Sequence, residues 1–407
     1  MRRISIGLIC TLLLLTSCTP NFNEKDEVLQ NDEESKGQPS IVPSYSLSDE
    51  NYRMILPYRT SEARGVIVNQ LANRLDIDEM EEGLRRHSKE FFDPEKYYFE
   101  EGQYLTDDTV YTWLGRNLTD EQLEAQVQAE IKRLQNAQMT VNEERIRDQF
   151  TRGLNPPIED EDSKDEQEDN PRYLSHILEQ NFLRKKEDNT VELVGVSIGL
   201  ALKSVYRYQT EVGGPYYYKE ISESKMLKQG QEIAQTVLER LREMEGLENV
   251  PIMIALYREE AQGSSTPGNF VAKTLVSEGN RTIGDWNNIN EDYVLYPSDE
   301  ADKKYYDDAQ IVKSFGDDIA QFFPNYVGVI GEGFYVNDEL QRMTLEVPIE
   351  FYGKGEILGF AQYAYSLVKE MFPDYYDLEV KISSSHQTEA VIYREAGQND
   401  PTVHIFH

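Results

Sequence analysis

The chain has 407 residues, of which 41 are Lys or Arg and 74 are Asp or Glu, so its formal net charge is −33. Apolar residues make up 39% of the sequence, which is enough to build a core and excludes a chain that is disordered throughout. The negative charge argues against nucleic acid as a partner, because phosphate binding needs a surplus of Lys and Arg. The two cysteines, Cys10 and Cys18, are too few for a disulfide framework or a thiolate metal site.

The first 17 residues have the pattern of a cleaved secretory leader. Arg2 and Arg3 give it a positive start, and a mostly apolar run, Ile4 to Leu15, follows them. That run is shorter than the roughly 20 residues of a transmembrane helix, but it fits a signal peptide, whose apolar region has about 7–15 residues. We therefore predict that residues 1–17 are removed from the mature protein.

The residues before Cys18 resemble a lipobox, the modification signal of bacterial lipoproteins. An aliphatic residue, Leu15, is followed by two small residues, Thr16 and Ser17, and then by the cysteine. The thiol is the nucleophile that accepts a diacylglyceryl group, and two acyl chains anchor a protein stably where one does not. We predict that Cys18 holds the mature chain on the outer face of the cell membrane, and that residues 18–50, which are polar and acidic, form a disordered tether.

Folded patterning begins near Tyr52. Its predicted elements in the first half are a strand over 54–59, helices over 66–76 and 79–92, and a helix that begins with the capping box Thr119 to Gln122. Pro156 and Pro157 end this helical region, and the acidic run that follows them repels itself. We therefore predict that residues 156–170 are a disordered loop, which lacks the residue spacing of a calcium-binding loop.

Two stretches of the second half alternate between apolar and polar residues, which predicts strands with one buried face. The apolar face of the first stretch consists of Val196, Ile198, Leu200 and Leu202. The apolar face of the second consists of Met343, Leu345, Val347, Ile349 and Phe351. A helical pattern follows each stretch, over 226–244 and 358–372. Further strands are predicted over 252–259, 378–382 and 390–395.

Short echoes relate these two parts of the sequence. Val194-Gly195-Val196 recurs as Val327-Gly328-Val329, and Ile254 to Arg258 is echoed by Ile55 to Arg59. We interpret the echoes as an internal duplication. The sequence thus predicts an α+β protein with two related repeats, residues 51–249 and 250–407. Each repeat would contain a mainly antiparallel sheet with helices on one face.

Four segments carry a family resemblance: LRRHSKE at 84–90, KYYFEEGQYL at 96–105, NPRYLSHILEQ at 170–180 and VGVSIGLAL at 194–202. Together with the lipobox they resemble the CamS family, the lipoproteins called sex pheromone cAM373 precursors in low-GC Gram-positive bacteria. The resemblance implies a lipid-anchored extracellular protein without catalytic residues. In some members the end of the signal peptide is released as a short hydrophobic pheromone. The corresponding stretch here, Thr11 to Ser17, is either such a message or a spent leader.

The stretch Gly195 to Gly199 matches the G-x-S-x-G motif of serine hydrolases. A nucleophile elbow needs a strand that turns directly into a helix, whereas Ser197 lies inside a predicted strand and the next helix begins only near Glu223. The remaining members of a triad would come from Asp374 or Asp377 and from His386. We predict that Ser197 is a structural residue between glycines that mark bulges or close backbone approach. An envelope serine hydrolase remains the alternative function.

Tyrosines and histidines are the other candidate ligand groups. Tyr is favoured at recognition surfaces, and one cluster is a candidate site for a peptide or glycan: Tyr206, Tyr208, Tyr216, Tyr217 and Tyr218. The scattered histidines are predicted to lie at the surface: His87, His176, His386, His404 and His407. The terminal pair supplies too few ligands for a metal site. We therefore predict a non-enzymatic extracellular binding protein without a metal or cofactor.

Overall fold

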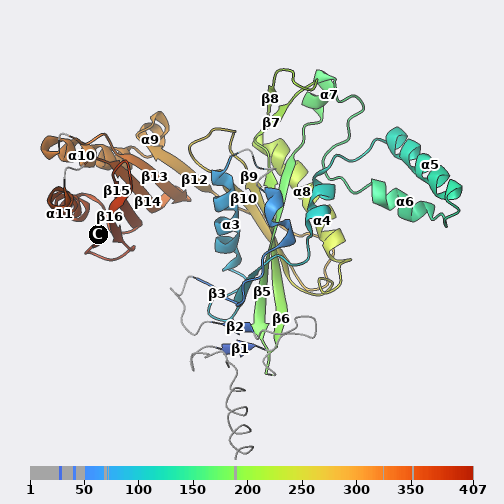
Figure 1. Cartoon of the computed structure of the whole chain (residues 1–407), viewed down its shortest axis with the longest axis horizontal. Helices are drawn as coiled ribbons and strands as arrows, with labels where there is room; N and C mark the ends of the chain where they lie inside the picture. Colours follow the sequence, from blue (N-terminus) through green and yellow to red (C-terminus); the bar gives the residue numbers. More distant parts are fainter. Residues whose placement is uncertain are drawn as a thin grey trace, which may run out of the picture.

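Two large sheets lie one beside the other along the long axis of the molecule in the computed structural model (Figure 1). The structure describes residues 27–29, 40–42, 51–67, 71, 73–187, 190–323, 325–350 and 353–406. The predicted signal peptide and Cys18 lie outside these ranges. Within the predicted tether, β1 (Glu27–Leu29) and β2 (Ser40–Val42) pair antiparallel, so the prediction of disorder is wrong for these two segments.

The first sheet has seven strands in the order β11-β10-β9-β6-β5-β4-β3. They are β3 (Arg53–Met54), β4 (Tyr98–Glu101), β5 (Leu174–Lys185), β6 (Val191–Leu202), β9 (Ile252–Arg258), β10 (Asn269–Val276) and β11 (Asn287–Asn288). The other elements of this unit are η1 (Glu62–Gly65), α3 (Leu75–Ser88), α4 (Asp107–Leu114), α5 (Asp120–Asn136), α6 (Glu143–Phe150), α7 (Lys164–Asp169), β7 (Val205–Tyr208), β8 (Tyr217–Glu220) and α8 (Glu223–Leu241).

Helices cover both faces of the first sheet. The predicted apolar face is confirmed, because its four residues in β6 lie in the core that contains α8. The opposite face is also buried: Ala201, Met253 and Ala255 belong to a second core with Met80 and Leu84 of α3. The prediction of helices on one face is therefore wrong for this sheet. Small side chains on β6 leave room for α3.

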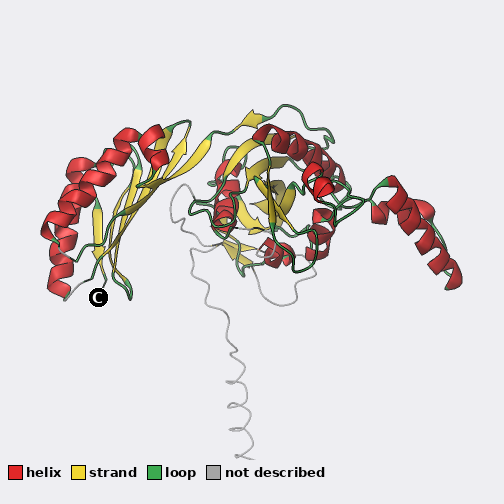
Figure 2. Cartoon of the chain, turned by 90° about the horizontal axis from the view of Figure 1, so that it is seen from above, coloured by secondary structure: helices red, strands yellow, loops and turns green. Residues whose placement is uncertain are grey.

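The second sheet has six strands in the order β12-β13-β14-β15-β16-β17. They are β12 (Glu291–Tyr296), β13 (Ile330–Val336), β14 (Glu339–Pro348), β15 (Asp377–Ser383), β16 (Thr388–Arg394) and β17 (Thr402–Ile405). The helices of this unit are α9 (Asp299–Lys304), α10 (Tyr306–Phe322) and α11 (Lys354–Met371). In Figure 2, α10 and α11 lie along one face of the sheet, as the sequence predicts.

The two sheets share a connection pattern. An antiparallel hairpin is followed by a helix and by a strand parallel to the hairpin's second strand, which gives β5-β6-α8-β9 and β13-β14-α11-β15. The tripeptide echoes do not mark equivalent positions in this pattern. Val194 to Val196 lies in β6, whereas Val327 to Val329 precedes β13, which takes the place of β5.

The division between the two units falls after β11, at residues 289–290. The predicted boundary near residue 250 is therefore wrong, because β9, β10 and β11 complete the first sheet. Buried strands of both units contain apolar residues and a Tyr-Arg pair, so short sequence echoes arise at positions that are not equivalent in the shared connection pattern.

Three local predictions also change. The predicted strand over 54–59 is reduced to Arg53–Met54. Of the predicted helix over 66–76, residues 68–70 and 72 lie outside the described ranges. The predicted helix over 79–92 corresponds to α3, which begins earlier, at Leu75, and ends four residues before the predicted Phe92. The capping box Thr119 to Gln122 is confirmed at the start of α5.

The acidic segment 156–170 is not a disordered loop, because α7 forms within it. Ser163 caps this helix by accepting from the backbone N–H of Glu166 at 3.3 Å. The side chain of Gln167 is buried and accepts from the Tyr206 hydroxyl at 2.6 Å. A cap and a buried contact thus order a segment whose charges repel one another. None of the helices in the described ranges has the length and apolar character that crossing a membrane requires.

A buried charged cluster joins α3 to the second unit. Arg86 Nη2 lies 2.7 Å from Glu79 Oε1 and 3.0 Å from Glu291 Oε1 of β12. The Tyr293 hydroxyl donates to the other oxygen of Glu79, and the Arg86 guanidinium lies 4.6 Å from the ring centre of Phe334. The Glu79 and Glu291 side chains are only 5% and 2% exposed. Two buried carboxylates therefore share one cation at the junction.

We expect Arg86→Leu to destabilise the protein by about 3 kcal/mol, because it removes the guanidinium that both buried carboxylates share. Urea unfolding at pH 7.5 measures the effect. Arg85→Leu is the matched control, since the Arg85 guanidinium lies over the ring of Phe99 at 5.3 Å and contacts neither carboxylate. Equal unfolding free energies for the two variants would show that the cluster does not hold the junction.

Candidate functional site

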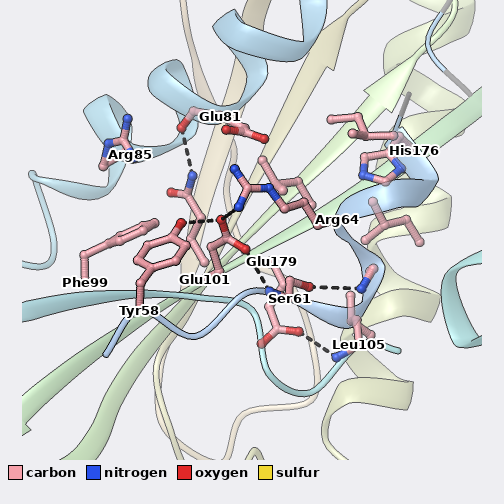
Figure 3. A pocket seen from close by; sticks show the side chains of 15 residues that line it. Tyr58, Ser61, Arg64, Glu81, Arg85, Phe99, Glu101, Leu105, His176 and Glu179 are labelled. Atoms are coloured by element: carbon pink, nitrogen blue, oxygen red, sulfur yellow. Dashed lines mark hydrogen bonds and ion pairs between the residues drawn. The ribbon is translucent and has the colours of Figure 1, made fainter. Parts of the chain in front are cut away.

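A small cavity lies beside β5, at the point where the neighbouring strand β4 ends and no longer pairs with it (Figure 3). Its walls come from η1, α3, β4 and β5, and its volume is about 50 Å³. A site for a drug-sized ligand has roughly 300–1,000 Å³, so this cavity has room only for a small molecule or a few waters.

Glu179 fixes the segment that crosses the end of β4. Its carboxylate accepts from the backbone N–H groups of Gln103 at 2.9 Å, Tyr104 at 3.2 Å and Leu105 at 2.7 Å. A Cβ at Gly102 would lie 2.6 Å from the Glu179 side chain, so the crossing needs glycine there. Burial raises the pKa of Glu179, and these backbone donors oppose that rise. The Glu179 carboxylate is thus used by the fold.

Glu101 closes the side of the cavity formed by η1. Its carboxylate accepts from the Tyr58 hydroxyl and from the backbone N–H of Ser61 at 2.7 Å. Arg64 Nη1 lies 3.2 Å from it. Burial, together with the hydrogen bond to Glu101, raises the pKa of Tyr58 to about 12. The charges of Arg64 and Glu101 therefore already satisfy each other.

Two charged groups on α3 face the same cavity, and neither has an ion-pair partner among the described residues. Glu81 and Arg85 both line it and lie one helical turn apart. Among the described residues, the Glu81 carboxylate has no hydrogen bond or ion pair, and the Arg85 guanidinium contacts only the Phe99 ring. Burial raises the pKa of Glu81. The wall formed by α3 therefore offers one unpaired anion and one unpaired cation.

The wall formed by β5 adds two buried neutral groups, His176 and Gln180, which are 2% and 3% exposed. Gln180 Nε2 donates to the backbone oxygen of Glu81 at 2.8 Å. Within the described ranges, Gln180 Oε1 and His176 Nδ1 have no hydrogen-bond partner. Burial lowers the pKa of His176 to about 3, so its imidazole is neutral at physiological pH.

The histidine prediction is therefore wrong in part. His176 is buried beside the cavity, and His87 is buried at the junction, where its Nε2 lies 3.1 Å from Glu291 Oε1. His386 and His404 are exposed, as predicted, and His407 lies outside the described residues. The described part of the chain contains no group of three or more His, Cys, Asp or Glu residues that would hold a metal ion.

Ser197 lies in the middle of β6 and is fully buried. Its hydroxyl lies 2.7 Å from the hydroxyl of Ser88, and no helix follows it directly. A Cβ at Gly195 would lie 2.0 Å from the Phe92 ring, and the pairing of β5 with β6 shifts register beside Gly195. The predicted position of Ser197 inside a strand, next to a close backbone approach, is therefore confirmed, and the geometry is not that of a nucleophile elbow.

The tyrosine cluster is mostly internal. Tyr206 and Tyr208 stack at 5.3 Å, and their hydroxyls donate to Gln167 and Glu168 of α7. Tyr217 stacks on Tyr208 at 5.5 Å. The exposed members are Tyr216 and Tyr218, at 50% and 60%. Three of the five predicted ligand groups thus hold the β7–β8 hairpin against α7.

A larger hollow at the junction of the two units has a different character. Its volume is about 530 Å³, and Arg258 and Lys304 are among its lining residues. Arg258 lies 3.1 Å from Glu260, and Lys304 lies 3.0 Å from Asp292. Because these cations are already paired, the cavity between α3 and β5 is the better candidate site.

We expect the neutral, buried His176 to make folding sensitive to acid. Its pKa in the folded protein lies below the ordinary value of about 6.5, so the unfolded chain binds the proton first and stability falls as the pH falls below 6.5. Relative to His176→Gln, the wild type should lose about 1.4 kcal/mol of unfolding free energy for each pH unit below 6. Urea unfolding between pH 4.5 and 7.5 measures this difference.

His386→Gln, which changes an exposed histidine, is the matched control and should follow the wild type. Parallel curves for His176→Gln and the wild type would show that His176 is protonated in the folded protein.

Comparisons with known proteins agree with this architecture. Residues 58–400 match the family model described as CamS sex pheromone cAM373 precursor. The chain is similar to the crystal structure of a sex pheromone precursor from Lactobacillus salivarius subsp. salivarius UCC118. The TM-score is 0.77 at 29% identity, over 90% of this chain and 99% of that one.

It is also similar to the C-terminal domain of the sex pheromone staph-cAM373 precursor from Staphylococcus aureus, with a TM-score of 0.68 at 30% identity, over 83% of this chain and 99% of that one. A search of curated protein sequences finds no significant match. Because the family model covers most of the chain, and both solved structures share its fold, the protein belongs to the CamS family.

Proposed function

We propose that the protein is a lipid-anchored extracellular binding protein that holds a small polar ligand in the cavity between α3 and β5. The unpartnered buried atoms of His176 and Gln180 carry this proposal. Buried polar atoms nearly always have hydrogen-bond partners, and an unsatisfied one costs about 1–3 kcal/mol. A ligand that supplies those partners offsets the cost, and this gain supports an occupant in the cavity.

The groups in the cavity favour binding over catalysis. His176 has a pKa of about 3, far too low for a general base at neutral pH. The hydroxyl of Ser61 accepts from the backbone N–H of Ala63 at 3.2 Å as the cap of η1. Ser197, the residue of the alternative hydrolase, is buried in β6 away from the cavity lining. The cavity therefore holds no nucleophile beside a competent base.

Filling the cavity tests this function. The wild-type mature chain is first screened by calorimetry against a library of small polar metabolites. Ala63→Leu adds three carbon atoms at a lining position, so it should abolish the binding of every compound that the wild type binds. Ser384→Ala, in the loop after β15 of the second unit, is a control that should bind as the wild type does. Unfolding curves establish that both variants fold. Binding that survives in a folded Ala63→Leu protein would place the ligand elsewhere.

The anchor is the second part of the proposal. Cys18 carries a diacylglyceryl group, which holds the folded body outside the membrane of a Gram-positive bacterium. The tail of the leader, Thr11 to Ser17, is a source of a short hydrophobic peptide. The lipobox of Leu15, Thr16 and Ser17 supports the anchor, and membership of a family of sex pheromone precursors supports the peptide.

Cys18→Ala should leave an unprocessed precursor that takes up no lipid. Growth with labelled palmitate, followed by membrane fractionation, should show label on the wild type and none on the variant. Cys10→Ala, which changes the cysteine inside the leader, should be labelled like the wild type. Equal labelling of Cys18→Ala and the wild type would rule out this anchor.

A further inference from the structure

We infer that the ligand of this cavity is a small zwitterion, a molecule with one ammonium group and one carboxylate, such as a free aliphatic amino acid. The inference rests on the proposed function, because it names the ligand class of the same site. It starts from the charges on the α3 wall of the cavity, where Glu81 and Arg85 are both unpaired within the described part of the chain.

The first argument is charge balance. Residues four apart on a helix have Cβ atoms about 5–6 Å apart, close enough for an ion pair, yet Glu81 and Arg85 do not pair. The other charges of the lining are satisfied, since Arg64 pairs with Glu101 and Glu179 accepts three backbone N–H groups. Glu81 and Arg85 remain without a hydrogen bond or ion pair within the described ranges, although the charges of Arg64 and Arg85 both act to lower the pKa of Glu81. A ligand with a single charge would leave one of them unmatched, whereas a zwitterion matches both.

The second argument is hydrogen bonding. An ammonium group has three donors and needs more than one acceptor. The Glu81 carboxylate and Gln180 Oε1 are two acceptors without partners, and the Gln180 amide already bonds the Glu81 backbone, which holds the two residues together. The Arg85 guanidinium offers the paired N–H donors that suit a carboxylate. Neutral His176 adds one further hydrogen-bonding atom.

The third argument is size and polarity. Phe99, Leu105 and Ile177 belong to the apolar part of the lining and are all nearly fully buried. A volume of about 50 Å³ excludes a nucleotide or a glycan chain but admits a molecule with a short aliphatic side chain. The polar groups and the apolar wall together fit an amino acid such as alanine.

Titration calorimetry of the mature chain with four matched compounds tests the inference. Alanine has both charges, N-acetylalanine keeps only the carboxylate, alaninamide keeps only the ammonium group, and N-acetylalaninamide has neither. We expect alanine to bind at least about tenfold more tightly than any of the other three, because each lacks a charge-assisted hydrogen bond.

Glu81→Gln should weaken alanine binding at least about tenfold, and Arg85→Gln should do the same. Glu82→Gln is the matched control, since Glu82 is the exposed neighbour that lies outside the cavity lining, and it should bind as the wild type does. Unfolding midpoints of all three variants exclude misfolding as the cause of lost binding.

The outcomes separate this inference from the function on which it rests. If N-acetylalaninamide binds as tightly as alanine and Ala63→Leu abolishes both, the cavity binds ligands but the zwitterion is wrong. If one singly charged compound binds best, the ligand class is likewise wrong. If neither these compounds nor any member of the wider library binds the wild type, both the inference and the binding function fail.

Discussion

The whole structure depends on one helix, α3, which packs on the first sheet and holds the second unit at the same time. Met80 and Leu84 face the sheet in a fully buried core. Glu79 and Arg86 contact β12 of the second unit. Glu79 accepts from the Tyr293 hydroxyl, and Arg86 forms an ion pair with Glu291. Glu81 and Arg85 line the cavity. At 100° per residue these three pairs form three separate stripes, so one short helix serves three surfaces.

That arrangement needs α3 to lie very close to the sheet. A Cβ at Gly83 would lie 2.6 Å from the Phe270 ring of β10, and the β6 residues beneath the helix are small. The resulting close contact fixes the rotation of the helix about its axis. Rotation by even one residue would move Glu81 and Arg85 out of the cavity and Glu79 away from Tyr293. The geometry of the site and that of the junction are thus set by the same packing contact.

The sequence predicts those parts of the fold that local periodicity determines. Helices α8 and α11 and strands β9, β15 and β16 follow from apolar spacing, because each buries one regular stripe. The boundary at residue 250 fails because sheet membership depends on pairing between distant strands. The surface position predicted for His176 is wrong because β5 is buried on both faces, so its polar residues do not mark an exposed side. The importance of Glu81, Arg85 and Gln180 comes from the partners they lack, which only the folded structure shows. Arg85 and Gln180 do lie within the segments that carry the family resemblance, and that is the one sequence signal for them.

The small volume of the cavity also bears on the relation between the leader and the folded body. The stretch Thr11 to Ser17 is a heptapeptide rich in leucine, whereas the cavity of about 50 Å³ has charged walls and room only for a much smaller molecule. This heptapeptide is therefore too large to be the occupant of the cavity in the folded body. The proposed release of the peptide would need only the leader and a peptidase, and the proposed ligand binding would need only the packing of α3 on the first sheet. The two proposed activities therefore have separate structural requirements, and substitutions that remove either one should leave the other intact.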